Sequence, residues 1–411
     1  MRRTSARRIR HPGRVEGTDG DAPEAPVVAL STVLREWGRI GVLGFGGPPT
    51  HIRLLRDLCV VREGWIGEHE FADAITACNL LPGPASTQLA IFCAWRVRAR
   101  RGAVVGGLSF IGPGLMLILA LSTLFLAGAP PWWIQAAGAG AGAGVAAVAV
   151  HAALGLVPAS WRRATAASSA ATWRWVLYLD VGASAAATLG AYVVIVLLGG
   201  GLVEVACRAY VRARERRPRH AIPVGAIGAA GAVGVWWSLG WVAIKVGALS
   251  YGGGFVIVPM MQADAVNRYH WMSAPQFLNA VALGQVTPGP IVLTVAVVGY
   301  AAAGLAGGLF AATIAFLPSF AFVLLGATRF DLLRGNVGVR AFLDGAGPAA
   351  IGAILGSAVP LARALGQPWQ LVVLGGAAAL LFLLRRPAVI TLLAAAAAGV
   401  LVVGLGAALP T

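Results

Sequence analysis

Long uncharged apolar runs alternate with short arginine-rich segments along this chain of 411 residues. The run 102–128 is typical, because it contains no charged residue and is rich in Leu, Ala and Gly. A run of this length crosses the roughly 30 Å hydrocarbon core of a bilayer as a helix, whereas an isolated strand would leave its backbone groups unsatisfied there. The pattern predicts an all-α polytopic membrane protein with roughly 11 to 13 transmembrane helices. Candidate spans cover 28–49, 71–95, 102–127, 131–157, 176–206, 232–258, 276–300, 304–328, 341–366, 369–384 and 387–408.

The same short motifs occur twice at a constant offset. Phe45-Gly46-Gly47 and Pro82-Gly83-Pro84 in the first half correspond to Tyr251-Gly252-Gly253 and Pro288-Gly289-Pro290 in the second (251 − 45 = 206; 288 − 82 = 206). Between these motifs Trp65 and Phe71 correspond to Trp271 and Phe277. Paired Gly/Pro-interrupted segments in the two halves of a membrane protein indicate the substrate site of a transporter.

The charges of the loops predict that the two halves have opposite orientations. Arginines at 96–101 follow the second span, whereas the matching loop 302–308 has no charge. Conversely, the loop 329–340 carries three arginines, and its counterpart near 123–134 is uncharged. Under the positive-inside rule this contrast indicates two inverted-topology homologous repeats. The arginines at 208–219 do not fit this scheme, and an additional span within 221–240 is one solution.

These patterns divide the chain into four parts. The predicted parts are a disordered cytosolic tail (1–27), a first repeat (28–206), a basic linker (207–222) and a second repeat (223–408). The basic start of the tail is followed by an acidic stretch and not by an apolar one, so a cleaved signal peptide is not expected. The expected location is the inner (plasma) membrane, with the N-terminus in the cytosol.

The composition supports the membrane assignment and excludes several other classes of protein. Hydrophobic residues make up 58% of the chain, charged residues make up 12%, and the mean hydropathy is +0.77. The net charge of +16 is concentrated in short loops, which is typical of topology signals and not of a nucleic-acid-binding domain. The four cysteines and six histidines form no metal-binding pattern, so neither a metal nor another cofactor is predicted. The Ala/Gly-rich stretch 138–147 indicates close helix packing.

The two Pro-Gly-Pro motifs are the first candidate binding elements. Each should interrupt a helix, because proline removes a backbone donor and clashes with the preceding turn. The helix that restarts after the break offers free N–H groups and a positive dipole end to an anion. A kink that serves only packing is the alternative. The candidate residues at the breaks are Asn79, Pro82, Gly83, Pro84 and Gln88, and Gln285, Thr287, Pro288, Gly289 and Pro290.

Further candidates lie close to the glycine motifs. Glycines there let a backbone approach a ligand, so Gly46 and Gly47, and Gly252 and Gly253, are included. His51 could contact an anion or titrate.

Charged side chains inside apolar spans are also candidates, because an intramembrane charge is costly and is functional by default. Arg39 and Lys245 are aligned cations within apolar spans (39 + 206 = 245). Arg39 has charged neighbours and could instead extend to the interface. Asp264 is a candidate proton carrier, with an exposed ion pair to Arg268 as the alternative.

These residues resemble the chromate ion transporter family. Phe45-Gly46-Gly47-Pro48 with His51, and Asn79 to Pro84 with Gln88, resemble its first half, whereas Lys245, the Tyr251 glycine motif and the segment from Gly284 to Pro290 resemble its second half. The likeness covers roughly 28–330 and implies a long-chain, two-domain chromate efflux protein. The implied activity is export of chromate driven by the proton-motive force, with sulfate as the related oxyanion.

Two other functions remain as alternatives. Transport of sulfate or another anion is the first, because no residue pattern indicates the size of the binding cavity. A membrane enzyme is the second, but it requires clustered acids, histidines or a nucleophile in the spans, and the histidines here are scattered. The expected partners are an oxyanion and the lipid bilayer, with no nucleic acid. The oligomeric state, including a homo-oligomer, is left open.

Overall fold

The structure is a computed structural model, and it describes residues 28–81, 83–128, 130–188, 193–213, 234–250, 255–326 and 336–410. The predicted tail 1–27, much of the predicted linker and the possible span before residue 234 lie outside the described residues. Within these ranges the regular elements are all helices, and no strand occurs among them. The fold is therefore all-α, as predicted.

The helices of the first half are α1 (Leu30–Leu43), α2 (Pro48–Arg56), the π-helical η1 (Asp57–Arg62), α3 (Glu68–Leu80), α4 (Ala85–Phe125), α5 (Trp132–Ala167), α6 (Ser169–Thr188) and α7 (Val193–Ala213). Those of the second half are α8 (Val235–Leu249), α9 (Ile257–Gln262), η3 (Ala263–Arg268), α10 (Ala274–Val286), η4 (Ile291–Leu293), α11 (Thr294–Gly326), α13 (Val337–Arg363), α14 (Pro368–Ala378), η6 (Ala379–Leu383) and α15 (Ala388–Gly404). The predicted single span over 176–206 was wrong, because α6 ends at Thr188 and a second helix begins at Val193.

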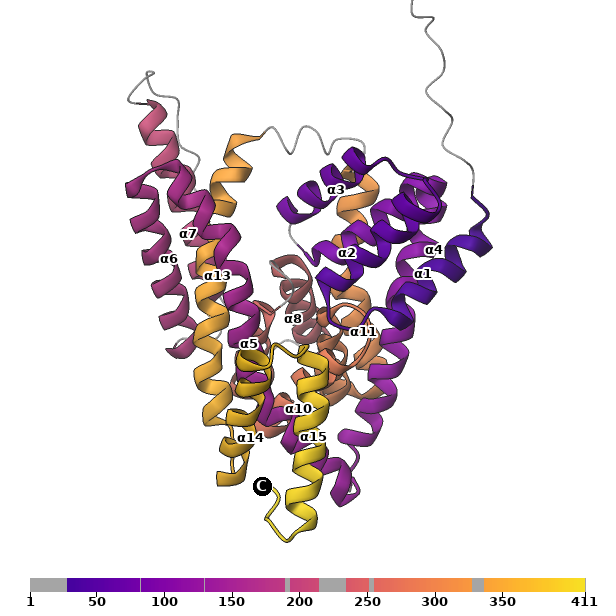
Figure 1. Ribbon diagram of the computed structural model, residues 1–411, viewed down its shortest axis with the longest axis vertical. Coiled ribbons are helices and arrows are strands. Elements are labelled where there is room, and N and C mark those ends of the chain that lie inside the picture. The colour runs from indigo at the N-terminus through magenta and orange to yellow at the C-terminus, as the bar shows by residue number, and fades with distance from the viewer. Residues whose placement is uncertain are drawn as a thin grey trace, which may run out of the picture.

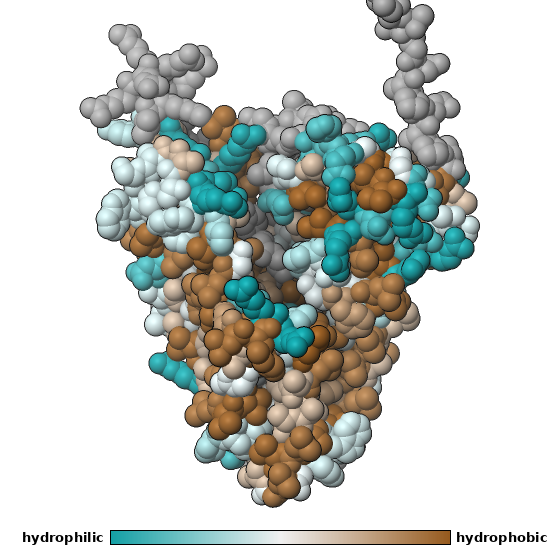
Figure 2. Space-filling view, viewed as in Figure 1, coloured by the Kyte–Doolittle hydropathy of each residue, from teal (hydrophilic) through white to brown (hydrophobic). Residues whose placement is uncertain are grey.

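Several helices are long and apolar enough to cross a bilayer. By length and composition these are Ala85–Phe125, Trp132–Ala167, Val193–Tyr210, Ile291–Gly326 and Val337–Arg363. Apolar surface covers the middle and lower part of the face seen in Figure 2, whereas hydrophilic surface gathers at its upper end. The protein is therefore a multi-pass membrane protein.

The helix boundaries repeat with nearly the offset of the sequence motifs. The helix before each break ends at equivalent positions, Leu80 in α3 and Val286 in α10 (80 + 206 = 286). Both α4 and α11 contain a sharp kink with a positive φ, 49° at Ala99 and 64° at Gly304 (304 − 99 = 205). The opposite membrane orientation of the two halves stays a prediction.

The helices form two groups, and each group contains helices of both halves. In the group called here the central unit (α1–α4 and α8–α11), α1 packs on α4, α8 packs on α11, and α4 contacts α11. In the flanking unit (α5–α7 and α13–α15), α13 packs on α6 and α7, whereas α5 packs on α14 and α15. Figure 1 shows α13 beside α6 and α7, and α14 and α15 beside the lower part of α5. The two halves are thus interlocked.

Glycines permit the closest approaches within both units. A Cβ on Gly247 of α8 would lie 2.0 Å from the Ala315 carbonyl oxygen of α11, so no larger residue fits there. In the flanking unit, a Cβ on Gly140 of α5 would lie 2.2 Å from the Ala395 carbonyl oxygen of α15. The close packing expected of 138–147 is therefore confirmed.

Candidate functional site

The first Pro-Gly-Pro motif forms a buried interruption between two helices. α3 ends at Leu80 and α4 begins at Ala85, and Gly83 between them has a φ of 118°, which favours glycine. Gly83 and Pro84 are buried, whereas Pro82 lies outside the described residues. The first turn of α4, with its free N–H groups and positive dipole end, therefore starts inside the protein.

Polar side chains from two helices surround this break. The Gln88 Nε2 atom lies 2.7 Å, and the Ser319 Oγ atom 3.2 Å, from the position that a Cβ on Gly83 would occupy. Thr87 and Ser319 are fully buried, and their hydroxyls have no hydrogen-bond partner among the described residues. Buried hydroxyls normally have a partner, so these groups are available to a polar ligand at the break.

The second break has a different environment. Gly289 has a φ of 103°, and its N–H donates a 3.1 Å hydrogen bond to the Gly44 carbonyl. The hydroxyls of Thr287 and Thr294 donate to carbonyls of their own helical turns, Leu283 and Ile291, at 2.8 Å each. Pro288 and Pro290 are buried, and the Gln285 Nε2 has no partner among the residues described. Among the residues that the structure describes, the first break thus combines a buried helix start with unpartnered hydroxyls, and the second does not.

A cavity of about 230 Å³ adjoins the first break. Its walls include Asn79 of α3, Gly83, Ser160 and Arg163 of α5, and Ile351 of α13. It therefore lies where the central unit meets the flanking unit, and Figure 2 shows the face hollowed between α3 and the α5–α13 pair. The volume accommodates several water molecules, each of which occupies about 30 Å³ in the liquid. A small hydrated oxyanion fits a space of this size.

Lys245 and Asp264, predicted for separate roles, form an ion pair with each other. The Lys245 Nζ atom contacts the Asp264 Oδ2 atom, and both side chains are largely buried. Lys245 also lies 5.9 Å from the centroid of the Trp241 ring. The Asp264 Oδ1 atom has no hydrogen-bond partner among described residues. The charge of Lys245 is thus already balanced within the second half.

His51 links the segment of the first glycine motif to the start of α4 through two hydrogen bonds. Its Nε2 donates a 2.8 Å hydrogen bond to the Gly44 carbonyl, and its Nδ1 lies 3.2 Å from the Ser86 Oγ atom. A carbonyl can only accept, so the proton is on Nε2, and in the neutral ring Nδ1 accepts from the Ser86 hydroxyl. Both nitrogens are thereby engaged, and His51 positions the break.

The remaining predicted residues are not gathered at the cavity. Arg39 lies on the exposed face of α1 and forms no ion pair with the described residues. Gly46 is exposed, whereas Gly47 is buried with its Cβ position 3.6 Å from the Ile291 side chain. Gly252 and Gly253 lie outside the described residues. A binding role for these residues stays a prediction.

An exposed ion pair holds the segment that leads into α3. Arg56 donates two 2.9 Å hydrogen bonds to the two carboxylate oxygens of Glu68, at the start of α3. These hydrogen bonds lower the pKa of the Glu68 carboxyl. A lowered folded-state pKa stabilises the fold above the unfolded-state value, and this contribution is lost as the pH falls through the folded-state value.

The sequence did not indicate two residues near the first break, Ser319 beside Gly83 and Arg163 in the wall of the cavity. Ser319 follows Pro318 in α11, and this pair corresponds to Pro113-Gly114 in α4 (319 − 114 = 205), so an alignment extended past the breaks would have found it. Arg163 carried no such signal, because it resembles the other loop arginines of the chain.

The comparisons with known proteins identify the family. The family model described as "Chromate transporter" matches residues 31–205 and 237–400. This chain belongs to the chromate transporter family. The two matched ranges fall within the predicted repeats 28–206 and 223–408.

The similar proteins are named as transport proteins. The "Chromate transport protein" of Cupriavidus metallidurans is 30% identical over 350 residues, which cover 84% of this chain and 85% of the relative. The "Chromate transport protein" of Pseudomonas aeruginosa is 29% identical, with 82% of each chain covered. An uncharacterized transporter of Methanocaldococcus jannaschii is 24% identical over 72% of this chain and 76% of its own. No solved structure matches. Membrane transport, rather than catalysis, is the activity for which the family members are named.

Proposed function

We propose that this protein exports chromate from the cytosol across the inner membrane, and that the proton-motive force drives the export. The observation that carries the proposal is the first break itself: Gly83 and the start of α4 line a cavity that Arg163 also lines, and the unpartnered Ser319 hydroxyl lies beside Gly83. The family supports chromate as the substrate, since its model is described as "Chromate transporter" and two of the similar proteins are named chromate transport proteins. Sulfate is the second candidate, because its tetrahedral dianion presents the same oxygens.

In this mechanism the dianion binds at the start of α4. Its oxygens accept hydrogen bonds from the N–H groups of the first turn of α4, where the helix dipole favours negative charge. The hydroxyls of Thr87 and Ser319 and the amide of Gln88 complete the contacts. Hydrogen bonds to charged groups are each worth about 1.5–3 kcal/mol, so a few of them compensate for a substantial part of the lost hydration.

The proton step is assigned to the Lys245–Asp264 pair. Protonation of Asp264 removes the negative charge that balances Lys245, and either charge left alone in the interior is costly. A proton bound at Asp264 therefore changes the stability of the conformation in which the pair is closed. This link between protonation and conformation is what coupling to the proton-motive force requires.

The test is chromate accumulation in everted inner-membrane vesicles from a chromate-sensitive bacterial host. We expect accumulation that an uncoupler abolishes and that empty-vector vesicles lack, with sulfate tested as a competitor. Joint replacement Thr87→Val and Ser319→Ala should raise the KM about 10- to 100-fold, since each tenfold change is about 1.4 kcal/mol. Thr313→Val is the matched control, because the Thr313 hydroxyl donates to Leu309 on the exposed face of α11.

Absence of accumulation, with the protein shown to be in the membrane, would overturn chromate export. Accumulation of sulfate without chromate would select the second candidate. Accumulation that the uncoupler leaves unchanged would overturn the proton-driven step alone.

A further inference from the structure

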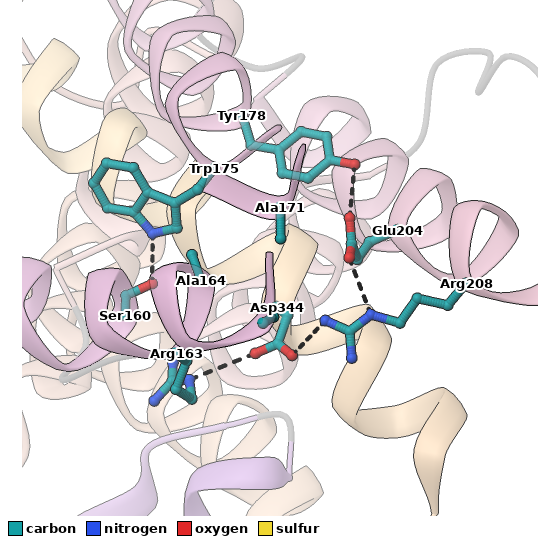
Figure 3. A pocket seen from close by; sticks show the side chains of 10 residues that line it. Ser160, Arg163, Ala164, Ala171, Trp175, Tyr178, Glu204, Arg208 and Asp344 are labelled. Atoms are coloured by element: carbon teal, nitrogen blue, oxygen red, sulfur yellow. Dashed lines mark hydrogen bonds and ion pairs between the residues drawn. The ribbon is translucent and has the colours of Figure 1, made fainter. Parts of the chain in front are cut away.

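A group of charged side chains joins four helices at one end of the flanking unit. Asp344 of α13 lies between Arg163 of α5 and Arg208 of α7 (Figure 3). Glu204 of α7 lies on the other side of Arg208. Arg174 of α6 completes the group. The first half supplies all of these residues except Asp344, so the group joins the two halves.

The carboxylates in this group do not balance the arginines. The buried Glu204 accepts hydrogen bonds from Arg174 at 2.8 and 3.0 Å, from Arg208 at 3.0 Å and from the Tyr178 hydroxyl at 3.2 Å. Asp344 then pairs with Arg208 at 2.8 Å. Three guanidinium groups thus share two carboxylates, and one positive charge is in excess.

Arg163 is the arginine on which this excess charge lies. Its Nε is 3.5 Å from the Asp344 Oδ1, the longest contact of the group, and 54% of its side chain is exposed. The side chains of Arg174 and Arg208 are 29% and 31% exposed, and both have hydrogen bonds of about 3 Å or less to carboxylates. A guanidinium has five N–H donors, so Arg163 keeps most of its donors for another partner.

Arg163 also faces the proposed substrate cavity. It lines both the small polar pocket drawn in Figure 3 and the 230 Å³ cavity, and in the cavity it shares the walls with Asn79 and Gly83. Ser160, one turn earlier on α5, lines both spaces too. The excess positive charge is therefore presented to the space next to the first break.

We propose that Arg163 is the cation that binds the oxyanion in the cavity, and that Asp344 holds Arg163 until the anion displaces it. The assignment rests on the proposed function. A planar guanidinium donates two parallel hydrogen bonds to an oxyanion, which an ammonium cannot do. The Asp344 carboxylate competes with the substrate for Arg163. A dianion is attracted to Arg163 strongly enough to displace this weakly held carboxylate, whereas a monoanion of the same shape is attracted less. Arg163 thus contributes to selection for doubly charged substrates.

The test compares variants of Arg163 with a matched neighbour in the vesicle assay. Arg163→Gln should raise the KM for chromate about 10- to 100-fold, and Arg163→Lys should raise it less, since charge is kept and the bidentate geometry is lost. Arg162→Gln removes an exposed arginine whose Nε donates a hydrogen bond to the backbone carbonyl of Pro158, and it should leave the KM unchanged. Added salt should raise the KM of the wild type more than that of Arg163→Gln.

Asp344→Asn provides an independent test with the opposite sign. Removal of the competing charge should lower the KM for chromate about threefold or more, and it should weaken discrimination between chromate and a tetrahedral monovalent oxyanion such as perchlorate. This variant decides the question if Arg163→Gln does not accumulate in the membrane. An unchanged or raised KM in Asp344→Asn would overturn the proposal.

Failure of this proposal is distinguishable from failure of the proposed function. If wild-type vesicles accumulate no oxyanion, the proposed function fails. If wild-type vesicles transport chromate and Arg163→Gln behaves as Arg162→Gln does, only the role of Arg163 fails.

Discussion

At the scale of single residues, key charges of this protein pair with opposite charges on other helices. Lys245 pairs with Asp264, and Arg163 pairs with Asp344 of the other half. Removal of either member of the buried Lys245–Asp264 pair leaves an uncompensated charge in the interior, whereas the half-exposed Arg163 is held only weakly by Asp344. The pairs therefore constrain the helices that carry them.

Variants of the Lys245–Asp264 pair should show strong coupling. Lys245→Met and Asp264→Asn should each lower the free energy of unfolding by about 3–5 kcal/mol, whereas the double variant should recover most of the loss. Thermal unfolding of the four detergent-solubilised proteins measures the cycle. If Asp264 also carries the proton, the folded double variant should lose uncoupler-sensitive transport. Additive losses in the double variant would contradict the pairing.

These charges stand out in the sequence, but their partners do not. Lys245 was marked as an intramembrane cation and Asp264 as a proton carrier, because charges in apolar spans stand out. Nothing local indicated that the two meet, since Lys245 is in α8, Asp264 is in η3, and α9 lies between these helices in the chain. Arg163 was missed for the same reason: its partner is on α13, and only the packing of α5 on α13 brings them together.

At the scale of helices, the kinks of α4 and α11 are equivalent in position but different in residue. The kink of α4 has an alanine at φ 49° and ψ −147°, whereas the kink of α11 has a glycine at φ 64° and ψ −156°. This backbone region is strained for a residue with a Cβ. The two halves thus share a bend, but only the second half has the residue that adopts it without strain.

Exchange of residues between the two kinks should change stability in opposite directions. Ala99→Gly should raise the free energy of unfolding by about 1 kcal/mol, and Gly304→Ala should lower it by about 1–3 kcal/mol. No atom lies within 4 Å of a Cβ added at Gly304, so the cost there is conformational and not steric. The midpoint of thermal unfolding in detergent measures both changes.

An ordinary helical position provides the control. Ala301→Gly, on the same side of the kink in α11, should lower the free energy of unfolding by about 1 kcal/mol, as glycine does in helices generally. If Ala99→Gly lowers it as well, the backbone strain assigned to Ala99 does not exist.

The breaks themselves were predictable because proline and glycine act locally. The proline rule placed both interruptions correctly, since α3 ends at Leu80 and α10 ends at Val286. Hydropathy failed over 176–206, because the apolar character continues there while the chain forms two helices, α6 and α7. The difference between the polar first break and the less polar second break depends on Ser319, which only packing brings to Gly83.

At the scale of the whole molecule, neither half has a complete core of its own. α5 packs on α14 and α15, and α13 packs on α6 and α7. The repeat predicted two equivalent halves, but it gave no information about which helices pair between them. The cavity lies between the central and flanking units, and each unit contains helices of both halves.

Separated halves should therefore be unstable alone and associate when made together. Fragments 1–222 and 223–411, produced singly, should be degraded or aggregate, because each exposes the faces that the other covers. Produced together, they should co-purify through a tag on one fragment and restore chromate transport. A monodisperse, stable fragment 1–222 obtained alone would contradict the interlocked arrangement.

Because the halves are interlocked, an early helix must wait during biosynthesis until its late partner has been made. Gly140 of α5 is packed against Gly399 of α15, which the ribosome reaches 259 residues later (399 − 140 = 259). At about 5–20 residues per second, α5 waits roughly 13 to 52 seconds for this partner. During that interval its glycine-rich face is open to lipid and to other nascent helices. Slower translation of the second half, for example through rare codons, should therefore lower the yield of folded protein even though every amino acid is unchanged.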